Sequence, residues 1–311
     1  MTGAETLARL GALIEADQAP LPAPARAMAE AIRARHGAAV QALLFYGSAL
    51  REGEGAGRML DFYVIVDRYR SLHGAGLAAL AAWALPPSVH FLQITDAGGQ
   101  RLSSKYAVIS EPAFHRRAGG GSLEPMLWAR FAQPATILAD DPAIRARLVR
   151  TLARACRHFA AEVAPLLRGP VGPDELWRRG LMESYRTELR PERPGPRAAE
   201  IVARFPERYA ALSAILLPGD GAGGFIAADA GRLARLACAG RWALRRLIGK
   251  PLGAARVLKA ATTFDGGLDY VLDKVARHSG VTIAVGARAR RHPVLAAPWI
   301  AWRLYRAGAF R

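Results

Sequence analysis

The sequence has few cysteines and no long apolar segment. Cys156 and Cys238 are its only cysteines, and two isolated cysteines provide neither a disulfide framework nor the spacing of a zinc site. No stretch of eighteen residues is free of charge and proline, which argues against a membrane-spanning helix. The N-terminal residues include Glu5 and Glu15 and lack a long apolar run, so we expect neither a secretory signal nor a transit peptide. These absences predict a reducing, cytoplasmic location, with attachment to the cytoplasmic face of a membrane left open.

Acidic residues and lysines are also scarce. The chain carries 43 Lys and Arg against 26 Asp and Glu, which gives a formal net charge of +17. Nearly all of the excess is arginine, because the only lysines are Lys105, Lys250, Lys259 and Lys274. A composition rich in alanine, arginine and glycine is typical of a GC-rich genome, which raises arginine content without any functional need. The charge still predicts attraction to polyanions, namely nucleic acid, nucleotides or an anionic membrane surface.

With 311 residues, 51% of them hydrophobic, the chain is long enough for one large domain or two modest ones. Strand and helix patterns alternate in the first part, amphipathic helical patterns follow, and basic residues then alternate with Leu and Trp. We therefore expect a catalytic domain over 1–140, a helical domain over 141–231 and a basic amphipathic region over 232–311. The predicted fold class is α+β, with a mixed sheet and flanking helices.

The segment 43–67, LLFYGSALREGEGAGRMLDFYVIVD, carries the main motif of the chain. An apolar run ends in Gly47-Ser48, a polar loop follows, and a second apolar run opens on Asp61, with twelve residues between Ser48 and Asp61. This strand, turn, loop and strand order is typical of the nucleotidyltransferase superfamily, in which Gly-Ser lets the backbone approach a triphosphate. The aspartate there holds the magnesium that bridges the phosphates. The same residues are also typical of an ordinary turn between two strands.

One feature of this motif departs from the superfamily. The usual Asp-x-Asp is absent, because Asp61-Phe62-Tyr63 stands in its place. Alternation along a strand puts Asp67 on the same face as Asp61, but too far along the strand to replace the missing metal ligand.

Further strands and helices are predicted around this motif. Strand-like alternation, turn residues and helical spacing set their bounds. We expect strands over 88–95, 102–110 and 135–138, helices over 68–84, 124–132, 143–167, 173–187 and 197–217, and a loop over 111–122.

These segments together resemble a specific family, the mitochondrial-type phosphatidate cytidylyltransferases (the translocator assembly and maintenance family). That family has a Tyr-Gly-Ser turn, a variable loop, and an aspartate followed two positions on by a hydrophobic residue. The resemblance extends in order from about residue 40 to 217. Its further segments are Leu72-His73, Arg101-Leu102 with KYAVIS at 105–110, LWARF at 127–131 with Gln133-Pro134, and SYRTELR at 184–190. Ala107 and Glu188 depart from the glycine and aspartate that are usual in the family.

The resemblance implies a reaction and a set of residues on the nucleotide side. The implied activity is the conversion of CTP and phosphatidate into CDP-diacylglycerol and pyrophosphate, with Mg²⁺ or Mn²⁺ as cofactor and no obligatory nucleic acid. Tyr46, Gly47, Ser48 and Tyr106 are expected to bind the nucleotide and its phosphates. Asp61 is expected to hold the metal.

The remaining implied residues neutralise charge and bind the lipid phosphate. Lys105 is expected to offset phosphate charge, although a lysine on a strand is equally consistent with a solvated strand end. Glu188 is expected to supply a second carboxylate from the helical domain, with Tyr185 and Arg190 on the lipid-phosphate side. The same three residues are also consistent with a helix end that carries ordinary surface charges.

The C-terminal region has basic residues interleaved with aromatic ones, a pattern typical of an interfacial membrane helix. Predicted membrane contacts are Trp299, Trp302, Arg303, Tyr305 and Arg306. The alternative is a basic surface helix whose tryptophans pack on the protein body.

Two other functions are consistent with the sequence. The first is a nucleotidyltransferase that acts on a soluble small molecule or on RNA, with the same Gly47-Ser48 and Asp61. The second is a catalytically inactive membrane scaffold, which the missing second aspartate favours.

Overall fold

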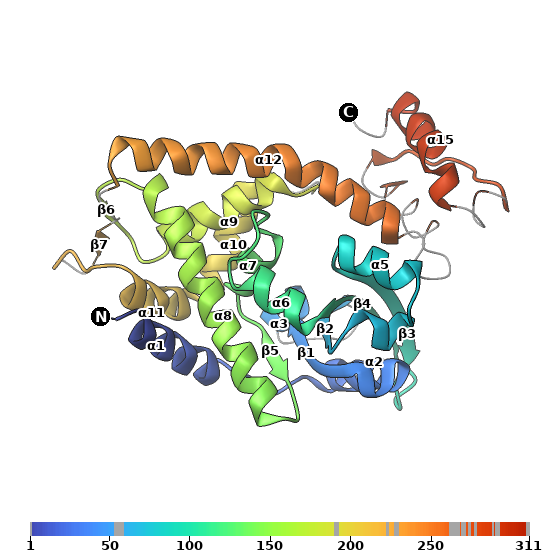
Figure 1. Ribbon diagram of the computed structural model, residues 1–311, viewed down its shortest axis with the longest axis horizontal. Coiled ribbons are helices and arrows are strands. Elements are labelled where there is room, and N and C mark those ends of the chain that lie inside the picture. Colours follow the sequence, from blue (N-terminus) through green and yellow to red (C-terminus); the bar gives the residue numbers. More distant parts are fainter. Residues whose placement is uncertain are drawn as a thin grey trace.

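A computed structural model describes most of the chain. The described residues are 2–52, 59–189, 193–221, 224–226, 230–260, 268, 272, 275–276, 279–287, 289 and 293–308. Within them the chain forms a mixed sheet with helices on both faces, followed by a helical region (Figure 1). The predicted α+β fold is therefore confirmed.

Five strands form the main sheet, in the order β3-β4-β2-β1-β5. Strands β2 and β4 are parallel, and the other neighbouring pairs are antiparallel. The strand bounds are β1 Val40–Tyr46, β2 Met59–Val66, β3 Ser88–Thr95, β4 Arg101–Ser110 and β5 Thr136–Leu138. Each strand falls where the alternation in the sequence predicts it, and the sheet places the end of β1 beside the start of β2.

Helices make up most of the remaining described structure. Their bounds are α1 Gly3–Ala16, α2 Ala23–His36, α3 Ser48–Glu52, α4 Tyr69–His73, α5 Leu77–Ala84, α6 Glu111–Ala118, α7 Met126–Phe131, α8 Pro142–Val163, α9 Glu175–Thr187, α10 Pro194–Ala203, α11 Pro206–Leu216, α12 Arg232–Ala260 and α15 Pro293–Arg306. Two short 3-10 helices, η1 Gly37–Ala39 and η2 Ala164–Leu166, and a two-stranded sheet of β6 Pro170–Val171 and β7 Phe225–Ile226 complete these elements.

The structure corrects three of the predicted helix bounds. The single helix expected over 68–84 is two helices, because the chain turns at Gly74 with a φ of +66°. The loop expected over 111–122 contains α6, which begins after Ser110 and has Pro112 in its first turn, a position where proline is well tolerated. The helix expected over 197–217 is broken before Pro206, which begins α11.

The two faces of the sheet are buried by different elements. Leu60, Phe62 and Val64 point to the face covered by α2, where Met28 and Ile32 are buried. The alternate residues of the same strands, Asp61 among them, point to the other face, where α6, α7 and α8 pack (Figure 1). Side-chain alternation along β2 therefore directs Asp61 toward the helical part of the molecule.

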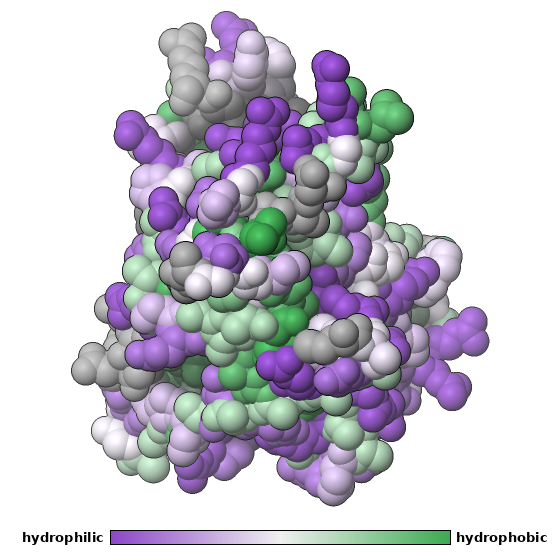
Figure 2. All heavy atoms as spheres, turned by 90° about the vertical axis from the view of Figure 1, so that its left-hand side faces the viewer, coloured by the Kyte–Doolittle hydropathy of each residue, from purple (hydrophilic) through white to green (hydrophobic). Residues whose placement is uncertain are grey.

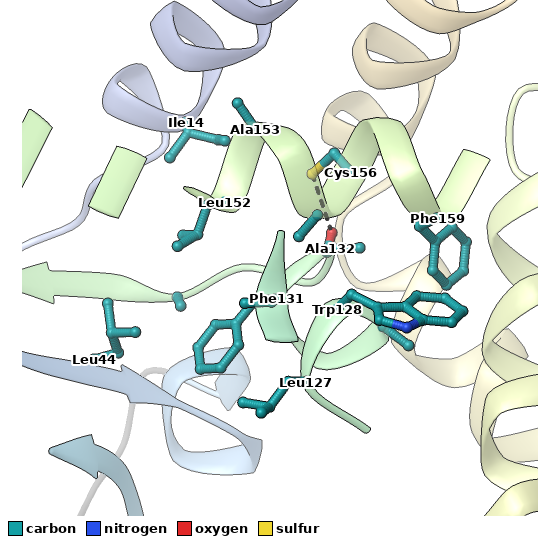
Figure 3. Close-up of a cluster of buried hydrophobic side chains, with 14 of the residues drawn as sticks. Ile14, Leu44, Leu127, Trp128, Phe131, Ala132, Leu152, Ala153, Cys156 and Phe159 are labelled. Atoms are coloured by element: carbon teal, nitrogen blue, oxygen red, sulfur yellow. Dashed lines mark hydrogen bonds between the residues drawn. The ribbon is translucent and has the colours of Figure 1, made fainter. Parts of the chain in front are cut away.

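The core on this second face continues without interruption into the helical region. Helix α7 lies at its centre, with Leu127, Trp128 and Phe131 directed into the cluster (Figure 3). The thiol of Cys156 on α8 lies 3.9 Å from the carbonyl oxygen of Ala132, just after α7. Burial raises the pKa of this thiol to about 12, so it is an inert core residue. One hydrophobic core spans both sides of residue 140, and the predicted domain division there stays a prediction.

Helix α12 lies along the outside of the helical region (Figure 1). Its Trp242 indole donates to the carbonyl oxygen of Glu162 at 2.9 Å, and Arg246 pairs with the buried Glu183 on α9 at 2.8 Å. Gly249 lies so close to the end of α9 that a Cβ added there would be 2.4 Å from the carbonyl oxygen of Thr187. The helix is thus fixed against the last turn of α9.

Candidate active site

The turn after β1 places backbone and carboxylate in direct contact. Tyr46, the last residue of β1, pairs with Asp61 on β2. The next residue, Gly47, has a φ of +93°, and a Cβ added to it would lie 2.5 Å from the Asp61 Oδ2 atom. Only glycine satisfies both the backbone conformation and this close approach. The Gly-Ser turn therefore holds the Asp61 carboxylate against the start of α3, where Ser48 lies.

The other wall of the site comes from the end of α9. Ser184 and Tyr185 lie in the last turn of this helix and are buried. Glu188 follows the helix with extended backbone, and its N–H donates to the carbonyl oxygen of Tyr185 at 3.2 Å. The helix therefore ends where Glu188 can face the strand ends, about 130 residues after Asp61 in the sequence.

These two walls enclose a pocket of about 110 Å³. Of the predicted site residues, it brings together Tyr46, Gly47, Ser48, Asp61, Tyr185 and Glu188. Residues that were not predicted as part of the site also line it, namely Arg130, Gln133, Pro134, Ser184 and Arg197. The pocket thus combines two carboxylates, two guanidinium groups and two tyrosines.

Arg130 places a positive charge beside Tyr46, at the end of β1. Its guanidinium carbon lies 5.0 Å from the centre of the Tyr46 ring, and its Nε atom is buried without a hydrogen-bond partner among the described residues. Burial alone would lower the pKa of Arg130, but Tyr46, Tyr63 and Glu188 nearby raise it above the ordinary value. The group is a fixed cation, suited to an anion such as a phosphate.

The donor set of the pocket fits one hard divalent cation shared with a substrate. Among the described residues, no group of three or more His, Cys, Asp and Glu side chains could enclose a metal alone. Asp61 and Glu188 nevertheless supply carboxylates to one pocket. Mg²⁺ is usually bound through one or two carboxylates together with substrate phosphates, so these two residues are its candidate ligands.

Lys105 and Tyr106 are placed on opposite faces of the sheet. Lys105 pairs in register with Asp61 across the parallel strands β2 and β4, so the two residues share a face, but Lys105 does not line the pocket. Tyr106 is buried on the α2 side, where its hydroxyl lies 2.9 Å from His36 Nε2 and its ring stacks on His90. The position of Tyr106 does not fit the predicted nucleotide contact, because neighbouring residues of a strand point to opposite sides.

The remaining predicted residues are Arg190 and the membrane contacts on α15. Arg190 lies outside the described residues. The predicted membrane contacts lie on the surface of α15, and they do not line the pocket. Trp299, Trp302 and Tyr305 are exposed, with Arg303 stacked 5.0 Å from the Trp299 ring and Arg306 stacked 5.2 Å from the Trp302 ring.

Arg130 is the main functional candidate that the sequence analysis missed as a site residue. It is the one charged residue in Leu127–Ala132, a segment whose other side chains are all buried and apolar. A charged side chain in such a segment must either be exposed or be held by a polar site. A single arginine in an otherwise apolar segment was therefore the sequence feature that could have indicated a functional role for Arg130.

Comparisons with known proteins give little further information. No protein-family model matches the sequence, and no curated protein matches it. Among solved structures, the chain is similar to a nucleotidyltransferase-like protein from Exiguobacterium sibiricum, with 12% identity and a TM-score of 0.27 over 90% of each chain. A similarity at this TM-score assigns neither a family nor a function.

Proposed function

We propose that this protein is a nucleotidyltransferase that converts CTP and phosphatidate into CDP-diacylglycerol and pyrophosphate at a membrane surface. One observation carries the proposal. The carboxylate of Asp61, packed on the positive-φ Gly47, shares a pocket with Ser48 and with Glu188 from the helical region. The resemblance of the same segments to phosphatidate cytidylyltransferases supplies the choice of substrates.

The proposed reaction is an in-line displacement at phosphorus. A phosphate oxygen of phosphatidate forms a bond to the α-phosphorus of CTP, while the bond from that phosphorus to the oxygen bridging to the β-phosphate breaks. Pyrophosphate leaves with that bonding pair. Both reactants are anionic, so catalysis depends on positioning and on neutralising charge.

Each residue of the pocket has a role in this scheme. Gly47 leaves its backbone open to a close approach by the triphosphate, and Ser48 supplies a hydroxyl group. Arg130, whose Nε atom is buried and whose guanidinium is always charged, would bind a phosphate group and offset its charge. Asp61 and Glu188 would hold Mg²⁺, which neutralises phosphate charge when bound.

The surface of α12 supports an acceptor that lies in a membrane interface. Arg245 is buried and pairs with Glu162, and Arg246 pairs with the buried Glu183. The exposed side instead carries a stripe of leucines at helical spacing: Leu233, Leu236, Leu244 and Leu247. Leu233 is 83% exposed and Leu247 is 72% exposed. On the side of the molecule where α12 begins, apolar side chains are visible among polar ones (Figure 2).

An exposed apolar stripe of this length marks a surface that contacts another apolar phase. None of the described helices has the length and apolar character needed to cross a bilayer. Because α12 packs on Thr187, next to Glu188, a helix lying in the interface would bring a lipid phosphate toward the pocket.

The direct test is an assay with radiolabelled CTP, Mg²⁺ and phosphatidate in vesicles, which measures labelled lipid and released pyrophosphate. We expect a labelled lipid from the wild-type protein and none from Asp61→Asn. Asp140→Asn is the matched control, because this aspartate is exposed and pairs with Arg33 on the surface. Labelled product on a soluble or RNA acceptor, with none on lipid, would contradict the lipid assignment. No transfer to any acceptor would favour an inactive scaffold.

A further inference from the structure

A second groove lies at the opposite end of β2 from the pocket. It has a volume of about 810 Å³ and begins beside Asp67 and Ser110, where the parallel strands β2 and β4 end. Helices α4 and α5 form one wall, and the first turn of α6 forms the other. Asp67 lies six residue steps along the chain from Asp61, which corresponds to about 20 Å of strand. The groove is therefore a site of its own, outside the proposed catalytic pocket.

The polar lining of this groove is cationic. Arg68, Arg70 and Arg116 line it, and all three are exposed to solvent. None of the three forms an ion pair with a carboxylate within the described part of the chain. The one acid of the lining is Asp67, whose Oδ2 accepts a hydrogen bond from the Ser71 hydroxyl at 2.8 Å. Three guanidinium groups against one carboxylate favour an anion with several oxygen atoms.

The remaining wall of the groove is apolar and exposed. Helix α5 has the sequence LAALAAWA and contains no polar residue. Leu80 is 57% exposed and Trp83 is 68% exposed, and both line the groove. A helix without a polar face is normally buried, so its exposure indicates a partner with an apolar phase of its own.

We propose that this groove binds the phosphate headgroup of an anionic phospholipid while α5 enters the headgroup and acyl boundary of the bilayer. A phospholipid carries both chemistries that the groove offers, an anionic phosphate and an adjoining apolar chain. The eight residues of α5 span about 12 Å, which suits a helix lying in the interface plane. Trp83 has the amphipathic ring that prefers this depth.

The position of α5 relative to α12 is consistent with a shared membrane surface. The Arg256 Nε atom on α12 donates to the carbonyl oxygen of Pro86 at 3.1 Å, and the Lys259 ammonium donates to the Ser88 hydroxyl at 3.2 Å. These bonds fix the segment after α5 to the last turns of α12, and the exposed leucines lie earlier along the same helix, between Leu233 and Leu247. The inference goes beyond the proposed transfer reaction, because headgroup binding here needs neither CTP nor the catalytic pocket.

The test is vesicle flotation of the full chain without CTP, using phosphatidylcholine vesicles with and without phosphatidylglycerol. The test variant is Arg68→Gln/Arg70→Gln/Arg116→Gln. The matched control, Arg26→Gln/Arg150→Gln/Arg154→Gln, removes the same charge from exposed arginines on α2 and α8. We expect the groove variant to bind anionic vesicles about tenfold or more weakly than the control, because each basic residue at the surface contributes about fivefold. Trp83→Ser should also weaken binding, with no change in formal charge.

Three outcomes would overturn the proposal. Equal losses in the groove variant and the control would show attraction by total charge alone. Unchanged vesicle binding in Trp83→Ser would remove α5 from the interface. Binding of soluble glycerol 3-phosphate by the wild-type protein, lost in the groove variant but without any preference for anionic vesicles, would assign the groove to a free phosphate ester. Because phosphatidate and CTP are absent, failure of the proposed transferase activity does not affect this result.

Discussion

Replacing Gly47 with alanine tests how the pocket is built. Alanine at a φ of +93° costs about 1–2 kcal/mol of stability, because its Cβ collides with the local backbone. The new Cβ would also lie 2.5 Å from the Asp61 Oδ2 atom, whereas ordinary contact begins at 3.4 Å. The carboxylate must move by about 0.9 Å, and a displacement near 1 Å at a reacting centre costs about 100-fold in rate.

Urea unfolding and the initial rate of CTP-dependent transfer measure the two effects separately. Gly37→Ala is the control, since Gly37 also has a positive φ, +59°, but nothing lies within 4 Å of the added Cβ. We expect the control to lose stability and keep its activity. In a double-mutant cycle, the stability cost of Gly47→Ala should be smaller in the Asp61→Ala background, because the clashing oxygen is gone. Full activity in Gly47→Ala would refute the contact between Gly47 and Asp61 as a requirement for catalysis.

Three further predictions concern other parts of the molecule. Arg130→Met should raise the KM for CTP at least tenfold in steady-state assays, because the pocket cation that would bind phosphate is lost. An unchanged KM would contradict this role. Gly249→Ala should lower the free energy of unfolding by about 2 kcal/mol or more in a urea titration, since its Cβ would lie 2.4 Å from the Thr187 carbonyl oxygen. The control Gly240→Ala, whose added Cβ would meet open space, should be neutral or stabilising in the same titration. Burial lowers the pKa of His90 to about 4, so the unfolded chain takes up a proton between pH 6.5 and 4 that the folded chain does not. His90 should therefore lower the free energy of unfolding by about 2 kcal/mol between pH 7 and pH 5. The His90→Phe protein should lack this contribution, so matched urea titrations of the two proteins at both pH values would detect the difference.

The sheet could be predicted from the sequence because its strands alternate clearly and are bounded by turn residues. The expected strand over 88–95 matches β3, and the motif at 43–67 gives β1 and β2 in the expected order. The first part of the pocket was predicted for the same reason. Local pattern alone places Gly47 and Ser48 at the end of one strand and Asp61 near the start of the next.

The rest of the pocket depends on long-range packing that no local pattern encodes. Glu188 reaches Asp61 only because α9 packs on the helices that cover the sheet. Arg130 faces the pocket because Trp128 and Phe131 fix α7 in the core. Tyr106 shows the opposite case, since strand alternation alone could have separated it from its neighbour Lys105.

The character of α12 was also only partly predictable. Its sequence shows arginines alternating with leucines, and we expected a basic amphipathic, membrane-associating region over 232–311. The structure places Arg245 inward because it pairs with Glu162 beneath the helix at 2.8 Å, and the leucines are left exposed. Which face of an amphipathic helix is buried depends on the partner it packs against, and the helix sequence does not contain that information.

The measurement that tests the central proposal most directly is calorimetric titration of CTP into the protein with and without Mg²⁺. We expect binding that requires Mg²⁺ and that is lost in Asp61→Asn and in Glu188→Gln, while Asp140→Asn binds like the wild-type protein. Binding that persists unchanged in both pocket variants, or no Mg²⁺-dependent binding by the wild-type protein, would contradict the assignment of this pocket to a nucleoside triphosphate.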